Sequence, residues 1–292
     1  MFIFKWYSYK YYYRGRVLSM GLAVSSSRGE FYLVGIGLST KYLTLEALEV
    51  IKAADYVFID TYTGRIDTRE LEEIVSKSFA RVSRKDLEEM SGRDILKLLS
   101  EGRKVVLLVP GDPLVATTHA SLLLEVHSRG FEYRVVPGVS VVPTALTLSG
   151  LMVYRMGKIA TVVYPKDNVM FEYPYDVIKA NDSLNLHTLL LLEYDGEKGI
   201  AMKSREALEI LRSIEEKRCE GVVREDRLVS TIAALGYPDF SICIGELKRI
   251  STLEIEEVPQ TLVFVSPKPH PIEVEMMKTV SSRWCRVEQP GS

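Results

Sequence analysis

Short apolar runs alternate with helix-like segments along residues 30–136, and this alternation constrains the fold more than any other feature of the sequence. The runs FYLVGIGL, DYVFID, KVVLLV and YRVV have the composition of buried strands. Residues 44–54, 69–78 and 92–102, and a segment ending at Gly130, have the spacing of helices with one apolar face. Strands that alternate with helices form a mostly parallel sheet with covered faces, so the predicted fold class is α/β.

A second α/β unit is predicted after Gly150, where strands outnumber helices and the sheet is expected to be mixed. Candidate strands lie at 158–165, 187–194, 228–235, 240–247 and 260–267, and candidate helices at 175–181, 203–216 and 270–280. Residues 137–150, PGVSVVPTALTLSG, lie between the units and are expected to form the hinge. We place an N-terminal α/β domain at residues 30–139 and a C-terminal one at 140–288, with a ligand cleft between them.

Residues 1–29 differ from the rest of the chain. MFIFKWYSYKYYYRGR is aromatic and basic, and VLSMGLAVSSS is an apolar run too weak for a secretory signal. One interpretation is an arm that binds a membrane or a partner. We favour a disordered extension, or a start codon assigned too early with translation beginning near Met20.

Composition argues against several classes of protein. Lys and Arg number 37 and Asp and Glu 39, so no basic excess points to nucleic acid. No apolar run approaches the ~18 residues of a membrane span. Cys219, Cys243 and Cys285 are far apart and form no C-x-x-C pair, so we expect no metal site and no disulfide framework. A reducing, cytoplasmic setting fits this cysteine usage.

The segment VPGDPLVATTH, residues 109–119, is the most specific motif. Pro110 and Pro113 fix the backbone on either side of Gly111 and Asp112. The loop follows a strand and precedes a helix, which is where open α/β sheets bind ligands. The carboxylate of Asp112 can hold ribose hydroxyls or a cation there, or it can cap the next turn.

Two neighbouring features leave alternatives open. Thr117 and Thr118 are equally plausible as helix N-caps, and His119 is expected to face solvent rather than to act in catalysis. Upstream, VGIGLST begins a G-x-G-x-x-G pattern but has Thr40 at its third position, so the dinucleotide fingerprint fails. Its glycine pair either brings the backbone close to a ligand or only forms a tight turn.

Six segments occur in the order and spacing of the diphthine synthase family, which has the tetrapyrrole methylase-like fold. They are FYLVGIGL, LTLEALEVIKAADYVFIDTYTG, VPGDPLVATTH, GLMVYRMGKIATVVYP, YDVIKAN with LHTLLLLE, and PHPIEVEMM. The resemblance implies an S-adenosyl-L-methionine-dependent methyltransferase. Its substrate would be the amine of a 3-amino-3-carboxypropyl group on a histidine of elongation factor 2, methylated repeatedly in diphthamide biosynthesis. A homodimer, with the cofactor between the two domains of each chain, is also implied.

When the family's cofactor contacts are carried over position by position, the resemblance implies contacts from both units. These are Leu38, Asp112, Val115, Ser140, Val141, Leu192, Leu235 and Thr261. No catalytic side chain is implied, because a sulfonium methyl is already activated and a neutral amine needs mainly desolvation and alignment. Tyr62 or Tyr164 can offer a cation–π contact to the ammonium product, but we favour both as core aromatics. The alternatives are a tetrapyrrole or ribosomal RNA methyltransferase of this fold, and a non-catalytic binding module.

Overall fold

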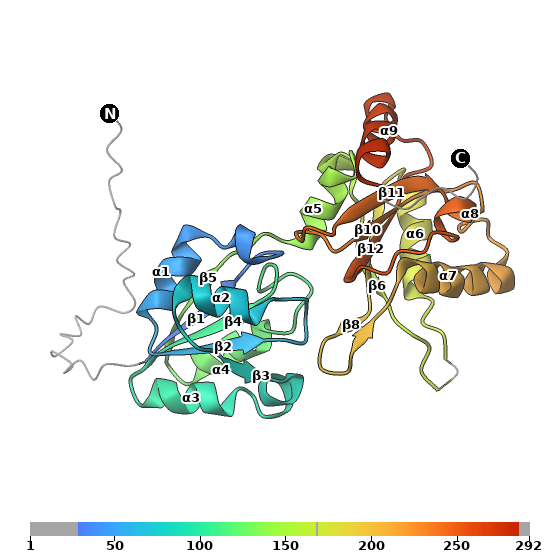
Figure 1. Ribbon diagram of the computed structural model, residues 1–292. Helices are drawn as coiled ribbons and strands as arrows, with labels where there is room; N and C mark the ends of the chain where they lie inside the picture. Colours follow the sequence, from blue (N-terminus) through green and yellow to red (C-terminus); the bar gives the residue numbers. More distant parts are fainter. Residues whose placement is uncertain (1–28, 168, 286–292) are drawn as a thin grey trace, which may run out of the picture.

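The computed structural model describes residues 29–167 and 169–285, which form two sheets with helices around each (Figure 1). The predicted extension therefore lies outside the described residues, apart from Gly29. The first sheet, in the N-terminal half, has the order β3-β2-β4-β1-β5 and is wholly parallel. Its strands are β1 (Glu30–Gly35), β2 (Tyr56–Asp60), β3 (Ala80–Val82), β4 (Lys104–Val109) and β5 (Glu132–Val136).

Helices cover both faces of this sheet, as its continuous apolar strands require. Alternate residues of each strand enter one of two cores. The first core packs against α1 (Leu45–Ala53) and α2 (Thr68–Val75), and the second against α3 (Arg93–Ser100) and α4 (Ala120–Ser128). The Thr44 hydroxyl accepts the Ala47 N–H at 3.1 Å and so caps α1, which confirms the predicted start of this helix.

The second sheet has the order β11-β10-β12-β7-β6 and is mixed, as predicted. Only β6 and β7 pair in parallel within it. The strands are β6 (Ala160–Val162), β7 (Thr188–Leu192), β10 (Leu228–Ala233), β11 (Ser241–Glu246) and β12 (Gln260–Phe264). The helices α6 (Tyr173–Ser183), α7 (Ser204–Arg218) and α8 (Leu247–Ile250) cover one face, and α5 (Val141–Leu148) and α9 (Pro271–Trp284) the other.

The expected hinge is shorter than residues 137–150, because residues 141–148 form α5. Ser140 is the N-cap of this helix, and its hydroxyl accepts the Val142 N–H at 3.2 Å. Pro143 falls in the first turn, where a missing N–H costs nothing. The connection between the sheets is therefore the short segment before Ser140. The ranges 30–139 and 140–288 stay our proposal for the domain limits.

A short hairpin reaches from the second unit toward the first (Figure 1). It consists of β8 (Tyr194–Asp195) and β9 (Ile200–Ala201). At its turn, the Gly196 N–H donates to the Tyr62 carbonyl at 3.2 Å, and Glu197 accepts the Arg84 N–H at 3.1 Å. The hairpin thus ties the two units together beside the cavity described below.

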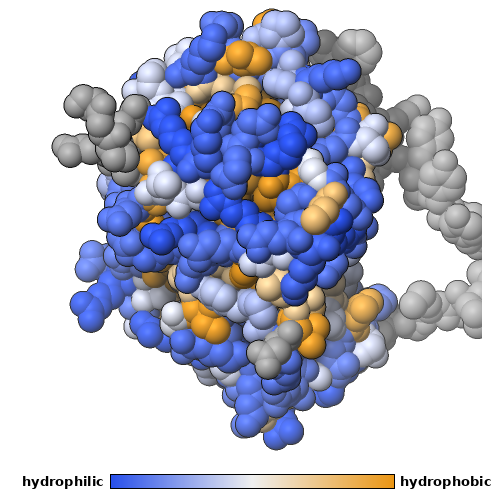
Figure 2. Space-filling view, turned by 90° about the vertical axis from the view of Figure 1, so that its right-hand side faces the viewer, coloured by the Kyte–Doolittle hydropathy of each residue, from blue (hydrophilic) through white to orange (hydrophobic). Residues whose placement is uncertain are grey.

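Within the described residues, none of the helices is both long and apolar enough to cross a bilayer. Figure 2 shows one face of the molecule as largely hydrophilic, with apolar side chains in separate patches. Scattered apolar residues of this kind are normal on globular proteins.

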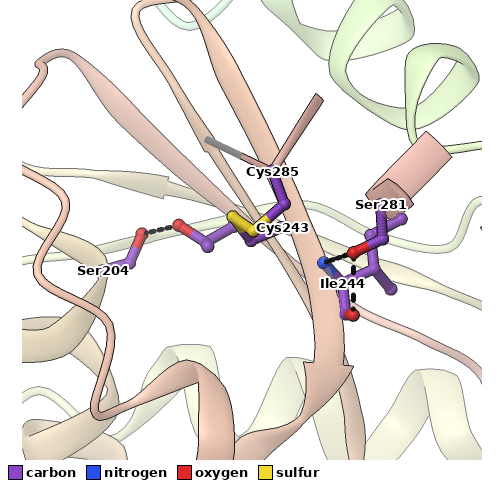
Figure 3. The surroundings of a disulfide bond; sticks show 6 residues. Ser204, Cys243, Ile244, Ser281 and Cys285 are labelled. Carbon is purple, nitrogen blue, oxygen red and sulfur yellow. Dashed lines mark hydrogen bonds between the residues drawn. A yellow bond between two sulfur atoms is a disulfide. The ribbon is translucent and has the colours of Figure 1, made fainter. Parts of the chain in front are cut away.

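The expectation of no disulfide is wrong, because Cys243 of β11 is bonded to Cys285 after α9 (Figure 3). The Ser281 hydroxyl also bonds to the backbone of Ile244, so α9 is fixed to the sheet at two neighbouring points. Cys219 is a free, exposed thiol. The sequence argument treated the three cysteines as one set, whereas two of them pair across 42 residues and leave the third alone.

The disulfide should stabilise the folded chain measurably. Closing a loop of 42 residues restricts the unfolded chain, and the lost entropy raises the free energy of the unfolded state by up to about 4 kcal/mol at 25 °C. We expect Cys243→Ser to lower the free energy of unfolding by about 2–4 kcal/mol, measured by urea denaturation. Cys219→Ser is the matched control and should leave stability unchanged. If the Cys243→Ser protein were as stable as the parent, the result would contradict the presence of the Cys243–Cys285 disulfide.

A buried ionic network joins α9 to the second sheet. Glu273 is fully buried, and its carboxylate accepts from Arg155 Nη1 at 2.8 Å and from His187 Nε2 at 2.9 Å. His187 Nδ1 accepts the Ser266 N–H at 2.9 Å. A ring that accepts at Nδ1 and donates at Nε2 is a neutral imidazole, so His187 is uncharged in the fold.

Both titratable groups of this network prefer their deprotonated forms. Burial lowers the pKa of His187 below its ordinary value, and this outweighs the opposing effect of the Glu273 carboxylate. Burial alone would raise the pKa of Glu273. Hydrogen bonds from the N–H groups of Met152 and His270 and from His187 outweigh that effect, so the pKa of Glu273 also lies below its ordinary value.

Stability should therefore fall as pH falls. Both pKa values are depressed in the folded state, so the unfolded chain binds more protons as pH drops below 6.5 for His187 and below 4.5 for Glu273. We expect the free energy of unfolding to decrease from pH 7.5 to 5.5 in urea titrations. His187→Gln should flatten this decrease, and the exposed-site control His127→Gln should not. An equal pH dependence in all three proteins would rule out the assignment to His187.

Candidate active site

The candidate site lies at the carboxyl edge of the first sheet, where the loops after β1, β4 and β5 meet. Gly37 and Gly111 exchange two backbone hydrogen bonds, of 3.1 Å from the Gly37 N–H and 2.8 Å from the Gly111 N–H. Both have positive φ, of 75° and 73°, a region that glycine enters without strain. Gly37, the second glycine of VGIGL, therefore pairs with Gly111 of PGDP. Its role is thus to join two loops and not only to form a tight turn.

Two further glycines let these loops come within van der Waals distance. A Cβ atom on Gly138, after β5, would lie 2.1 Å from the Gly111 carbonyl oxygen. A Cβ atom on Gly35 would lie 2.6 Å from the same oxygen. Backbone occupies the space that these side chains would need, so the three loops can meet only through glycine.

Asp112 joins two of these loops with its side chain. Its Oδ1 accepts the Leu114 N–H at 3.0 Å, and its Oδ2 accepts the Gly138 N–H at 3.3 Å. The first bond is the turn-capping role expected as one alternative. The second was not expected. It places the carboxylate between the loop after β4 and the loop after β5, at the wall of a cavity.

The cavity has a volume of about 260 Å³ and is lined by residues of both units. All positions carried over by the resemblance lie along this single cavity: Leu38, Asp112, Val115, Ser140, Val141, Leu192, Leu235 and Thr261. They come from six separate segments of the chain. The structure therefore brings the predicted set together, and their contact with a cofactor stays a prediction.

Further cavity residues were not found from the sequence. The wall also contains two cations, two phenols and four neutral polar side chains: Arg65, Arg84, Tyr194, Tyr237, Thr63, Thr117, Thr161 and Gln260. Apart from Thr117, which belongs to the VPGDPLVATTH motif, they lie in loops or on strands and belong to no spacing pattern. Only the fold, which apposes the loops of one unit to those of the other, assigns them to the site.

Arg65 connects the two units at one side of the cavity. Its Nη1 donates to Asp239 at 3.1 Å and to the Val258 carbonyl at 3.3 Å, and its guanidinium lies 4.1 Å from the ring centre of Tyr237. The Tyr237 hydroxyl donates to the Arg65 carbonyl at 2.7 Å. Burial raises the pKa of Tyr237 to about 12 and also raises the pKa of Tyr194, so both phenols stay protonated at neutral pH.

The prediction that His119 faces solvent is wrong. Its side chain is 1% exposed, and Nε2 lies 3.2 Å from Oδ2 of the fully buried Asp60, without hydrogen-bond geometry. Asp60 also accepts from the N–H groups of Tyr62 and Thr63, at 2.8 and 3.1 Å, and so shapes the loop after β2. His119 is at the N-cap of α4.

The two threonines before His119 do not cap α4 with their side chains. The Thr117 hydroxyl donates to the Pro113 carbonyl at 2.7 Å, within the loop. The Thr118 hydroxyl donates to Glu88 at 2.7 Å. Both hydroxyls are used as donors, which stiffens the loop and ties it to the segment that carries Arg84.

The core interpretation of the two tyrosines agrees with the structure. Tyr62 is 1% exposed, and its ring lies under the Arg84 guanidinium, 4.8 Å from the ring centre. Tyr164 is half-buried and packs against the core of the second unit. Neither lines the cavity, so neither ring faces a substrate there.

The glycine contact at the edge of the sheet can be tested by adding one methyl group. In Gly138→Ala the new Cβ would meet the Gly111 carbonyl, which is backbone and cannot move aside. We expect a loss of about 2–4 kcal/mol in the free energy of unfolding, measured by urea denaturation. Gly245→Ala in β11 is the control, since its Cβ would meet side-chain atoms at ordinary distances of 3.6 Å and more. Equal stability of the two variants would refute the packing constraint.

Comparisons with known proteins agree with this geometry. A family model described as Tetrapyrrole (Corrin/Porphyrin) Methylases matches residues 30–251. The diphthine synthase of Pyrobaculum islandicum is 36% identical over 252 residues, which cover 86% of this chain and 99% of the relative. That of Methanopyrus kandleri is 37% identical over 260 residues, covering 86% and 96%.

A solved structure is similar as well. A crystal structure of diphthine synthase matches with a TM-score of 0.77 and 31% identity, covering 87% of this chain and 96% of the other. These relatives do not favour the alternatives of a tetrapyrrole or ribosomal RNA methyltransferase. The fold, the cavity and the relatives lead to one conclusion: the chain belongs to the tetrapyrrole methylase family and, within it, to the diphthine synthases.

Proposed function

We propose that this chain binds S-adenosyl-L-methionine in the cavity between its two units and makes diphthine. The acceptor is the amine of a 3-amino-3-carboxypropyl group on a histidine of elongation factor 2. The observation that carries the proposal is that residues matched to the cofactor in this family, although far apart in sequence, line one cavity. The names of the relatives supply the acceptor.

The residues present fit such a cofactor. Leu38, Val141 and Leu235 give the cavity an apolar wall suited to a purine ring. Asp112 gives it a carboxylate suited to ribose hydroxyls. The glycine contacts keep this part of the wall free of side chains, so a ligand can approach the backbone closely.

The chain's own task in the reaction is to bind, orient and desolvate. Bound S-adenosylmethionine supplies a methyl group that is already activated by its sulfonium. The acceptor amine resembles that of Lys, whose pKa is about 10.4, and must lose its proton to react. Burial in the cavity lowers that pKa, and alignment of the two reactants lowers the barrier further.

The described side chains of the wall do not offer an obvious general base. Asp112 already accepts two backbone N–H bonds, and the raised pKa values of Tyr194 and Tyr237 keep their phenols protonated. We therefore propose that proton loss from the amine precedes its entry or occurs to water. A homodimer and a cytoplasmic location belong to the same proposal and rest on the family resemblance.

Purified protein should methylate elongation factor 2 that carries the 3-amino-3-carboxypropyl-histidine. We expect incorporation of labelled methyl groups from S-adenosylmethionine, counted by mass spectrometry of the modified peptide. Precorrin-type tetrapyrroles and ribosomal RNA serve as competing acceptors and should remain unlabelled. Transfer to either of these, with none to the factor, would overturn the proposal.

Asp112→Ala should weaken binding of S-adenosylmethionine by roughly tenfold or more, because a hydrogen bond to a charged group is lost. Isothermal calorimetry gives the affinity without turnover. Asp226→Ala is the matched control, since Asp226 is 68% exposed and pairs only with Arg224 among the described contacts. If the Asp112→Ala protein bound S-adenosylmethionine as tightly as the parent, Asp112 would not be a cofactor-binding residue.

A further inference from the structure

We infer that Arg84 binds the carboxylate of the acceptor group and thereby selects the substrate and lowers the pKa of its amine. This inference rests on the proposed function, because it takes the aminocarboxypropyl group as the acceptor. That group carries a carboxylate on the same carbon as the reacting amine. A cavity that desolvates such a carboxylate must provide a cation or several donors for it.

The cavity wall divides into two sets of residues. One set consists of the positions matched to the cofactor, and it contains no cation. The remaining wall contains Arg65 and Arg84, which are the only cations among the described residues that line the cavity. The acceptor carboxylate is therefore expected at this second part of the wall.

Arg65 is already committed to other partners. Its charge is paired with Asp239, and the same nitrogen donates to the Val258 carbonyl. Its guanidinium is also held on the Tyr237 ring. These bonds join the two units, so Arg65 has a structural role that a substrate would have to disrupt.

Arg84 has unused hydrogen-bonding capacity. Its Nε is buried and has no hydrogen-bond partner among the described residues, which is costly for a donor of this strength. Its Nη1 forms an exposed i,i+4 ion pair with Glu88 at 3.3 Å, and the same Glu88 Oε1 accepts a shorter 2.7 Å bond from Thr118, while no bond from Nη2 is seen among the described residues. A carboxylate that approaches the outer nitrogens of the guanidinium can accept two N–H bonds from them.

Arg84 is also held in place for this role. The face of the buried Tyr62 ring supports the guanidinium at 4.8 Å, and the hairpin residue Glu197 accepts the Arg84 backbone N–H. The side chain is still 43% exposed, so a ligand can reach its outer nitrogens. A fixed cation on a rigid aromatic support loses little freedom when it binds a carboxylate.

The position of a cation near the amine has a chemical consequence. A positive charge disfavours the ammonium form, so Arg84 beside the carboxylate lowers the pKa of the acceptor amine and increases its reactive, neutral fraction. Removing that charge raises the pKa of the amine, and a higher pH is then needed to reach the same rate.

The test compares Arg84→Gln and Arg84→Lys with the parent, using elongation factor 2 that carries the aminocarboxypropyl group. We expect Arg84→Gln to raise KM for this acceptor by roughly 10- to 100-fold, with Arg84→Lys in between. The rising limb of the pH–rate profile should shift to higher pH in Arg84→Gln. The affinity for S-adenosylmethionine, measured by calorimetry, should stay within about twofold of the parent, which also shows that the variant is folded.

Arg129→Gln is the matched control, because Arg129 lies at the exposed end of α4 and pairs with Glu125. It should behave as the parent does. Unchanged acceptor KM and pH profile in Arg84→Gln would overturn the inference, as would a loss of S-adenosylmethionine binding in the same variant. A parent protein that fails to methylate the factor would instead overturn the proposed function, so the two failures are distinguishable.

Discussion

The cavity exists because three loops of the first sheet meet through bare backbone. The Gly111 carbonyl occupies the space in which side chains at Gly35 and Gly138 would lie, and Gly37 pairs with Gly111 by two hydrogen bonds. This contact fixes where Asp112 stands, since its carboxylate bonds to Gly138 of the neighbouring loop. Close backbone packing therefore determines the shape of the cavity wall contributed by the first unit, and with it the position of the Asp112 carboxylate.

Local patterns in the sequence were sufficient for most of the architecture, although β3 was not predicted and α5 was taken as part of the hinge. Alternating apolar runs and amphipathic segments predicted the parallel sheet, the mixed second sheet and the main helices, because strand and helix periodicities are properties of neighbouring residues. The loop with Asp112 was placed correctly at a strand end by its prolines and glycine. The family resemblance brought together residues as distant as Leu38 and Thr261, which line one cavity in the fold. That they hold the cofactor stays a prediction.

The errors arose where a residue's state depends on distant partners. His119 looked like a polar residue at a helix start, but the fold buries it beside Asp60 and the Tyr62 ring, which follow β2 far away in the sequence. Cys243 and Cys285 have no local motif, and only the packing of α9 against β11 brings them together. Arg84 follows an unremarkable strand, and its place in the cavity depends on how the loops of the two units are apposed. No spacing rule within a single segment carries this information.

The contacts that bridge the two units respond differently to the salt concentration of the solution. Arg65 holds Asp239 on one side, and the Gly196 amide holds the Tyr62 carbonyl on the other. The two contacts differ in character. The ion pair is exposed and is screened by dissolved ions, whereas the amide bond is not. A rise in ionic strength therefore weakens one of these two contacts between the units and leaves the other unchanged.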